Sequence, residues 1–158
     1  MAEDLILAGN TKKEKYISLI PQIKALVDFE TDPIANMGNL CAALKFGFSF
    51  FWVGFYLIKE NELVLGPFQG PVACTRIKKG KGVCGQAWET NSVLIVDDVD
   101  AFPGHIACSS LSKSEIVLPI YNAKQEIIGV LDVDSEAYNT FDKTDELYLK
   151  QIIELIKF

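Results

Sequence analysis

The chain carries little positive charge for its length. Its 158 residues include 15 Lys and Arg against 21 Asp and Glu, which gives a net charge of -6 at pH 7. Nucleic acids and anionic membrane surfaces are bound through basic patches. The only local cluster of basic residues is Lys78, Lys79 and Lys81. The composition therefore argues against a nucleic-acid partner and against a membrane partner.

Long apolar runs and a targeting segment are also missing. The longest apolar stretch, 46–58, is interrupted by Gly47, Ser49 and Gly54, whereas a membrane-spanning helix needs about 20 apolar residues. The N-terminus, MAEDLILAGN, has acidic residues where a secretory signal has Lys or Arg. We therefore expect a cytoplasmic protein. In a reducing cytosol its four cysteines are expected to be thiols, ligands or redox centres rather than structural disulfides.

The sequence has no internal repeat, no low-complexity tract and no linker rich in proline, glycine or serine. A chain of this size buries roughly two thirds of the surface that its unfolded form exposes. Residues 1–158 are therefore expected to form a single domain.

Apolar periodicity predicts an α+β fold. Predicted helices span 11–29, 32–47, a short turn at 86–90, and 142–157; predicted strands span 50–58, 62–65, 93–96, 115–121 and 126–133. Pro21 is expected to kink or split the first helix. The order of elements predicts an antiparallel sheet with helices on one face and long loops on the other. Irregular segments at 66–85 and 97–113 are candidate functional loops.

The four cysteines fall into two groups. Cys41 lies on the apolar stripe of the second predicted helix, where a small buried hydrophobe is expected. Cys74, Cys84 and Cys108 lie in the two irregular segments, where a thiol is reachable and nearby cations such as Arg76 lower its pKa. From the residues alone, redox or ligand chemistry and inert buried thiols both remain open for these three.

Two specific alternatives involve His105, the only histidine. Cys74, Cys84, His105 and Cys108 form a formal zinc ligand set, but their spacing lacks the close pairs that structural zinc usually uses. We therefore expect no metal. A Cys-His hydrolase would need His105 beside Cys108 and a third group to orient it, and sequence proximity does not establish either.

Three carboxylates lie near the ends of the last two predicted strands. Glu115 opens one strand, and Asp132 and Asp134 alternate with Val133 in the other, so that both aspartates face one side of the sheet. They form either an acidic patch suited to an amine or guanidinium, or a solvated strand end.

Aromatic residues dominate the strand 50–58. Phe50 and Trp52 are expected on one face, and Phe51, Val53 and Phe55 on the other. One face is core, and the other is either core or the wall of a pocket.

Six motifs occur in order between Leu65 and Ser135: GPFQG, ACTRI, GVCG, FPGHIAC, SEIVLP and LDVDS. Together they resemble the free methionine-(R)-sulfoxide reductases, which are single GAF-domain enzymes, and the flanking helices and the FWVGFY strand fit as well. The resemblance implies a GAF fold with loops over a small-molecule pocket. It also implies reduction of free L-methionine (R)-sulfoxide without a cofactor and with thioredoxin as the reductant. A homodimer is compatible with this class.

The resemblance also assigns residue roles. Cys108 matches the catalytic cysteine, and Cys74 the resolving cysteine, with Cys84 as an alternative. The acids of the substrate site correspond to Glu115, Asp132 and Asp134, and a pocket-wall aromatic to Trp52. Ser109 departs from the pattern, because an aspartate is common there and its loss affects the thiol pKa or the order of disulfide formation.

The residue types suit this chemistry. Glu115 is expected to protonate the sulfoxide oxygen, and Cys108 to attack as a thiolate and become a sulfenic acid that condenses to a disulfide. Asp132 and Asp134 are expected to bind the substrate ammonium. A GAF sensor for a nucleotide or tetrapyrrole, a zinc protein and a purely structural protein remain alternatives.

Overall fold

The computed structural model describes residues 5–106 and 108–158. Six strands form one antiparallel sheet in the order β3-β2-β1-β6-β5-β4. The strands are β1 (Trp52–Lys59), β2 (Glu62–Gln69), β3 (Arg76–Lys78), β4 (Leu94–Val96), β5 (Ser114–Tyr121) and β6 (Ile127–Ser135). The central position of β1, β6 and β5 means that residues on either face of these strands are covered.

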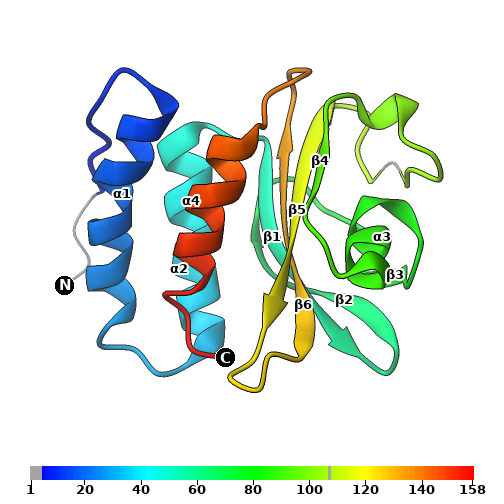
Figure 1. The fold of residues 1–158 in the computed structure, drawn as a ribbon, viewed down its shortest axis with the longest axis horizontal. Coiled ribbons are helices and arrows are strands. Elements are labelled where there is room, and N and C mark those ends of the chain that lie inside the picture. Colours follow the sequence, from blue (N-terminus) through cyan, green and yellow to red (C-terminus); the bar gives the residue numbers. More distant parts are fainter. Residues whose placement is uncertain (1–4, 107) are drawn as a thin grey trace.

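Helices cover the two faces of the sheet unequally. α1 (Lys12–Val27), α2 (Pro33–Phe48) and α4 (Lys143–Ile153) lie on one face, and α3 (Gly82–Thr90) lies with the long loops on the other (Figure 1). A short 3-10 turn, Val99–Ala101, belongs to the loop side. This arrangement confirms the predicted α+β architecture. Within the described residues, no helix combines the length and apolar character required to cross a membrane.

Local sequence signals set the helix starts. Thr11 and Glu14 form a capping box at α1, and the Asp32 side chain accepts from the backbone of Ile34 and Ala35 before Pro33 opens α2. Of the two expected outcomes, a kink or a split at Pro21, the split does not occur, because α1 is continuous from Lys12 to Val27. Pro21 lies on the exposed side of the helix, while the opposite side packs into the core.

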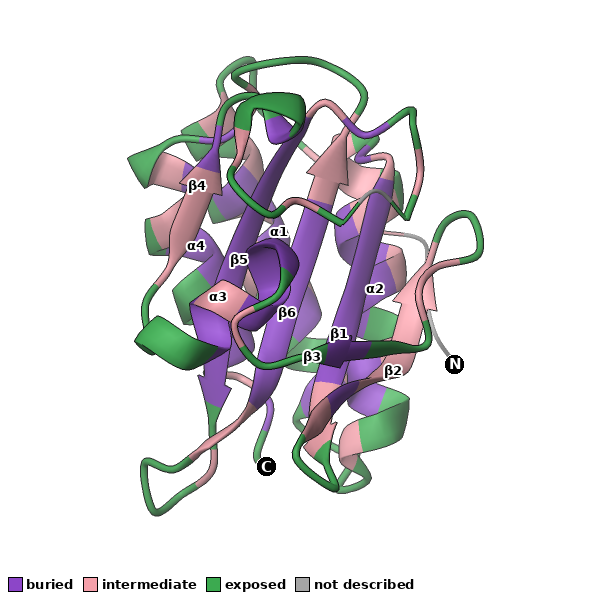
Figure 2. Cartoon of the chain, turned by 90° about the vertical axis from the view of Figure 1, so that its right-hand side faces the viewer, coloured by how far each residue is buried: buried purple, intermediate pink, exposed green. Residues whose placement is uncertain are grey.

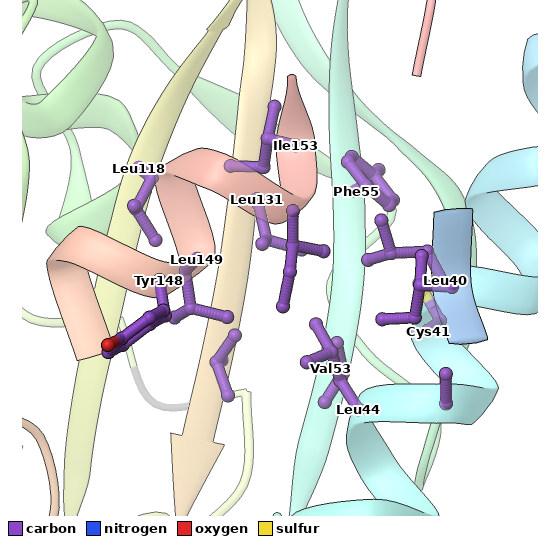
Figure 3. Close-up of a cluster of buried hydrophobic side chains, with 14 of the residues drawn as sticks. Leu40, Cys41, Leu44, Val53, Phe55, Leu118, Leu131, Tyr148, Leu149 and Ile153 are labelled. Atoms are coloured by element: carbon purple, nitrogen blue, oxygen red, sulfur yellow. The ribbon is translucent and has the colours of Figure 1, made fainter. Parts of the chain in front are cut away.

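The main core lies between α1, α2 and α4 and the sheet. Figure 3 shows side chains of α2, β1, β6 and α4 meeting there, including Leu44, Val53, Leu131 and Leu149. Cys41 is part of this core with 0% exposure, as expected for a small buried hydrophobe. The core fixes the orientation of the central strands, and so determines which residues point to the loop side.

The segment 66–85 is more ordered than expected. β2 continues to Gln69, because a bulge opposite Phe55 accommodates Gly66 and Pro67. Glycines that suggest a loop instead allow close packing: a Cβ on Gly85 would collide with the carbonyl oxygen of Lys78. The result is a complete helix α3 against β3, in place of the short turn predicted at 86–90.

Phe50 and Trp52 do not share a face, contrary to the predicted alternation. Regular pairing of β1 begins only at Trp52, so the period of two does not extend back to residues 50 and 51. Phe50 packs in the helix-side core, with its ring centroid 5.2 Å from that of Phe48. Phe51 instead contacts the loop-side cluster, whereas Val53 and Phe55 face the helices.

Candidate active site

The register of three strands assembles a row of functional side chains. Asp134 of β6 is paired with Trp52 of β1 on one side and with Glu115 of β5 on the other. Directly opposed residues of antiparallel strands point to the same face, and Asp132, two residues before Asp134, joins them. All four residues therefore line one pocket on the loop side of the sheet. The strands beneath this pocket are buried along much of their length (Figure 2).

A disulfide covers the pocket. Cys74, in the loop after β2, is bonded to Cys108, in the segment that precedes β5, with their Cα atoms 5.6 Å apart. Both cysteines belong to irregular segments, as expected, and Cys108 is exposed. The Cys74 loop is held down by two strand residues. Tyr56 Oη donates to the Cys74 carbonyl at 2.9 Å, and Trp52 Nε1 donates to the Pro71 carbonyl at 3.0 Å.

Cys84 has a different position from the one expected. It lies in α3 rather than in an irregular segment, and only 4% of it is exposed. Its Sγ donates to Glu115 Oε1 at 3.9 Å. α3 is tied in turn to the loop containing His105, because Gly82 N donates to the Gly104 carbonyl at 3.2 Å. Cys84 is therefore a buried wall of the pocket.

The cavity of the pocket is about 50 Å³, which is small beside the usual range for small-molecule sites of about 300–1,000 Å³. The zinc set considered from the sequence does not assemble around a metal, because Cys74 and Cys108 are bonded to each other. His105 lines the pocket and is partly exposed. A different potential ligand set is formed by Cys84, Glu115 and Asp132, whose ligand atoms lie within 4.8 Å of one another.

The acids occupy a pocket without a compensating cation: neither Lys nor Arg is among the described residues that line it. Burial, followed by the charges of Asp132 and Asp134, raises the pKa of Glu115 well above its usual range. Burial and Asp134 do the same for Asp132. Burial raises the pKa of Asp134 to about 6, against a hydrogen bond from the Ser112 hydroxyl that lowers it. Burial thus favours the neutral, proton-donating forms of Glu115 and Asp132, whereas Asp134, with a pKa of about 6, is mostly ionised at pH 7.

Cys84 is subject to the same environment. Burial, followed by the charges of Asp132 and Glu115, raises the pKa of its thiol well above the ordinary value. Cys84 is therefore a poor nucleophile at neutral pH.

Two pocket residues were not anticipated from the sequence. Tyr56 is on the same face as Trp52, with ring centroids 5.9 Å apart, and strand alternation from Trp52 would have pointed to it. Ser112 lies in the irregular segment before β5 and hydrogen-bonds Asp134. No pattern in the sequence marks Ser112, because its role depends on how that segment crosses the sheet.

Known proteins resemble this chain over nearly its whole length. Residues 40–158 match the family described as GAF domain. GAF domain-containing protein A of Dictyostelium discoideum is 62% identical, with 99% of both chains covered. The free methionine-R-sulfoxide reductase of Escherichia coli is 46% identical, covering 90% of this chain and 86% of that protein.

The fold also matches a solved structure closely. A free methionine-R-sulfoxide reductase from Neisseria meningitidis, solved in complex with its substrate, superposes with a TM-score of 0.94. It is 52% identical in sequence and covers 98% of this chain and 93% of that one.

Proposed function

The chain belongs to the GAF-domain family of free methionine-R-sulfoxide reductases, and on this premise we propose that it reduces free L-methionine (R)-sulfoxide to L-methionine. The observation that carries the proposal is the Cys74–Cys108 disulfide, which closes over a pocket containing the buried carboxyl groups of Glu115 and Asp132 and the half-buried Asp134. Such a pocket combines a redox-active pair with proton donors. It suits the reduction of a small polar sulfur compound.

Substrate selection is assigned to the aspartates and Trp52. The ammonium group of a free amino acid supplies the positive charge that the pocket lacks, and its binding favours the ionised forms of Asp132 and Asp134. Trp52 forms the apolar wall for the methyl group. A methionine within a polypeptide has no such ammonium group, and the loops over the pocket hinder the chain on either side of it.

The first chemical step involves Glu115 and Cys108. Glu115, kept protonated by burial, donates a proton to the sulfoxide oxygen while the Cys108 thiolate attacks. The oxygen passes to the Cys108 sulfur, which is oxidised to a sulfenic acid. The sulfoxide sulfur is reduced by two electrons, and methionine is released.

The second step restores the thiols. The Cys74 thiol attacks the sulfenic acid, water leaves, and the Cys74–Cys108 disulfide forms. An external dithiol, proposed to be thioredoxin, then supplies two electrons and reduces the disulfide. Cys74 is preferred to Cys84 as the resolving residue, since Cys74 is bonded to Cys108 and Cys84 is buried with a raised pKa.

Three further parts of the proposal concern the cellular location, the oligomeric state and the domain limits. A cycle that depends on free thiols requires a reducing compartment, which supports a cytoplasmic location. The homodimer and the domain limits 1–158 remain predictions.

The test is turnover of three sulfoxides in parallel under dithiothreitol: free L-methionine (R)-sulfoxide, its (S) epimer and a peptide-bound (R)-sulfoxide. Only the free (R) form should be consumed. Cys108→Ser should abolish even one turnover, whereas Cys74→Ser should release one methionine per chain and fail to recycle. Cys41→Ala, on the other face of the sheet, is the matched control. No turnover of any of the three sulfoxides by folded, reduced protein would reject the proposal.

A further inference from the structure

Cys84, Glu115 and Asp132 bring one thiol and two carboxylates together inside the pocket. One ligand atom from each lies within 4.8 Å of the others, and Cys84 Sγ is 3.9 Å from Glu115 Oε1. A tetrahedral zinc ion with Zn–S of about 2.3 Å and Zn–O of about 2.1 Å places sulfur and oxygen about 3.6 Å apart. The Cys84–Glu115 pair is therefore only a few tenths of an ångström wider than a zinc site requires, and the other pairs lie within 4.8 Å.

Asp132 provides a second and independent observation. Its side chain is 7% exposed, and Oδ1 has no hydrogen-bond partner among the described residues. A buried carboxylate oxygen without a partner is costly. Since neither Lys nor Arg lines the described pocket, this oxygen lacks a protein cation and is directed toward a site that suits one.

The three ligands lie on regular elements, namely α3, β5 and β6. The fold therefore fixes their positions independently of the redox state of the Cys74–Cys108 pair. We infer that Cys84, Glu115 and Asp132 form a binding site for a zinc-class divalent cation, with its fourth position open to the pocket.

The ligand chemistry selects the ion. A thiolate with two carboxylates is a donor set for zinc and cobalt, which accept sulfur and oxygen in four-coordinate sites. Mg²⁺ and Ca²⁺ require six or more oxygen ligands. The site should therefore discriminate strongly against these two ions.

Occupation of this site has a consequence for catalysis, which rests on the proposed function. Glu115 and Asp132 are the groups assigned to the sulfoxide oxygen and the substrate ammonium. A bound Zn²⁺ ion coordinates both carboxylates, so neither can interact with the substrate. Zinc is therefore a competitive inhibitor with respect to free methionine sulfoxide.

Binding is tested first on the oxidised protein, in which Cys74 and Cys108 are bonded and Cys84 and Cys41 are the free thiols. Titration with Co²⁺ should give a saturable thiolate-to-cobalt charge-transfer band with one ion per chain, and Zn²⁺ should displace it. Cys84→Ser and Cys84→Ala should remove the band. Asp132→Asn should weaken binding at least tenfold, and the matched control Cys41→Ala should bind normally.

Three results would overturn the site: no charge-transfer band, a band that persists in both Cys84 variants, or equal displacement by Mg²⁺. Because these readouts need no turnover, they hold whether or not the reductase activity is found.

Competition is tested on pre-reduced protein freed of external thiols, which would chelate the metal. Methionine released in a single turnover should fall in the presence of Zn²⁺ and recover as substrate is raised. Inhibition that excess substrate does not relieve would refute the competition. Absence of turnover in metal-free protein would instead reject the proposed function, leaving the cobalt result intact.

Discussion

Glu115 and Asp134 are direct cross-strand partners in the β5–β6 ladder, so two carboxyl groups point side by side into the same pocket. Directly opposed like charges destabilise a sheet. Burial raises the pKa of both groups, so the native state favours their protonated forms. Ionisation of Asp134 above its native pKa of about 6 therefore lowers the stability of the fold at neutral pH.

Replacement of Asp134 by Asn should stabilise the protein near pH 7. The native pKa of Asp134, about 6, lies above its ordinary value of 3.8. Between these values the native state binds more protons than the unfolded state, so the free energy of unfolding falls as pH rises. The loss is on the order of 3 kcal/mol, at about 1.4 kcal/mol per pKa unit. Asp134→Asn should flatten this decline, measured by urea unfolding of the oxidised protein at about pH 4 and about pH 7.

The same variant should lose activity, because it removes a carboxylate assigned to the substrate ammonium. Glu136→Gln, which changes an exposed acid just after β6, is the control and should behave as the unmodified protein. A variant that is no more stable at pH 7 would show that Asp134 is not held in an unfavourable environment.

Gly54 is required where Trp52 lies against β2. A Cβ added at Gly54 would collide with the Trp52 ring and lie 2.6 Å from Phe68 Cβ. Gly54→Ala should therefore cost about 1–3 kcal/mol in overpacking. It should also lower kcat/KM at least tenfold, because the Trp52 ring must move from the pocket wall.

Gly38→Ala is the matched control, since nothing lies within 4 Å of the added Cβ in the middle of α2. It should leave activity unchanged and raise stability by about 0.5–1 kcal/mol. Unchanged kcat/KM in Gly54→Ala would discard the role of Trp52 in the pocket wall.

Local patterns were sufficient for much of the architecture. Capping residues such as Asp32 mark where helices begin, and the alternation of Asp132, Val133 and Asp134 places both acids on one face. Both patterns depend only on neighbouring residues, so they can be read from the sequence without knowledge of the tertiary structure. The resemblance to the family then predicted that these acids and the cysteines belong to the same site.

The remaining features depend on distant parts of the chain. Cys74 and Cys108 are 34 residues apart, and no spacing rule distinguishes their pairing from one involving Cys84. The burial of Cys84 results from α3 packing over β5 and β6, where its thiol meets Glu115, while Gly85 permits the close approach of α3 to β3. The pairing of Asp134 with Trp52 follows from strand register, which the sequence of a single strand does not determine.

Thiol reactivity should separate the cysteines of the reduced protein into two classes. Burial raises the pKa of Cys41 to about 12 and that of Cys84 well above its ordinary value. Alkylation follows exposure and thiolate content, so Cys74 and Cys108 should react with iodoacetamide at least tenfold faster. Timed labelling followed by peptide mass spectrometry measures the four rates. Labelling of Cys84 as fast as Cys74 would restore Cys84 as a candidate resolving cysteine.

Tyr16 and Asp145 connect α1 and α4 through a buried hydrogen bond, with Tyr16 Oη donating to Asp145 Oδ1 at 2.8 Å. Both side chains are 0% exposed, and the other Asp145 oxygen accepts from Lys12 Nζ and from the Asp142 backbone. Tyr16→Phe removes the donor and leaves a buried carboxylate oxygen unsatisfied. This should cost about 2–3 kcal/mol, because hydrogen bonds to charged groups are worth more than neutral ones.

The activity of Tyr16→Phe should remain unchanged, because this contact lies on the face of the sheet opposite the pocket. Tyr148→Phe is the control: its ring stacks on Tyr16 with centroids 5.3 Å apart, and its hydroxyl has no hydrogen bond among the described residues. Urea unfolding and kcat/KM measured on both variants separate the two effects. A fall in kcat/KM for folded Tyr16→Phe, without a loss of stability, would mean that the helix layer affects the pocket directly and is not only a support for the sheet.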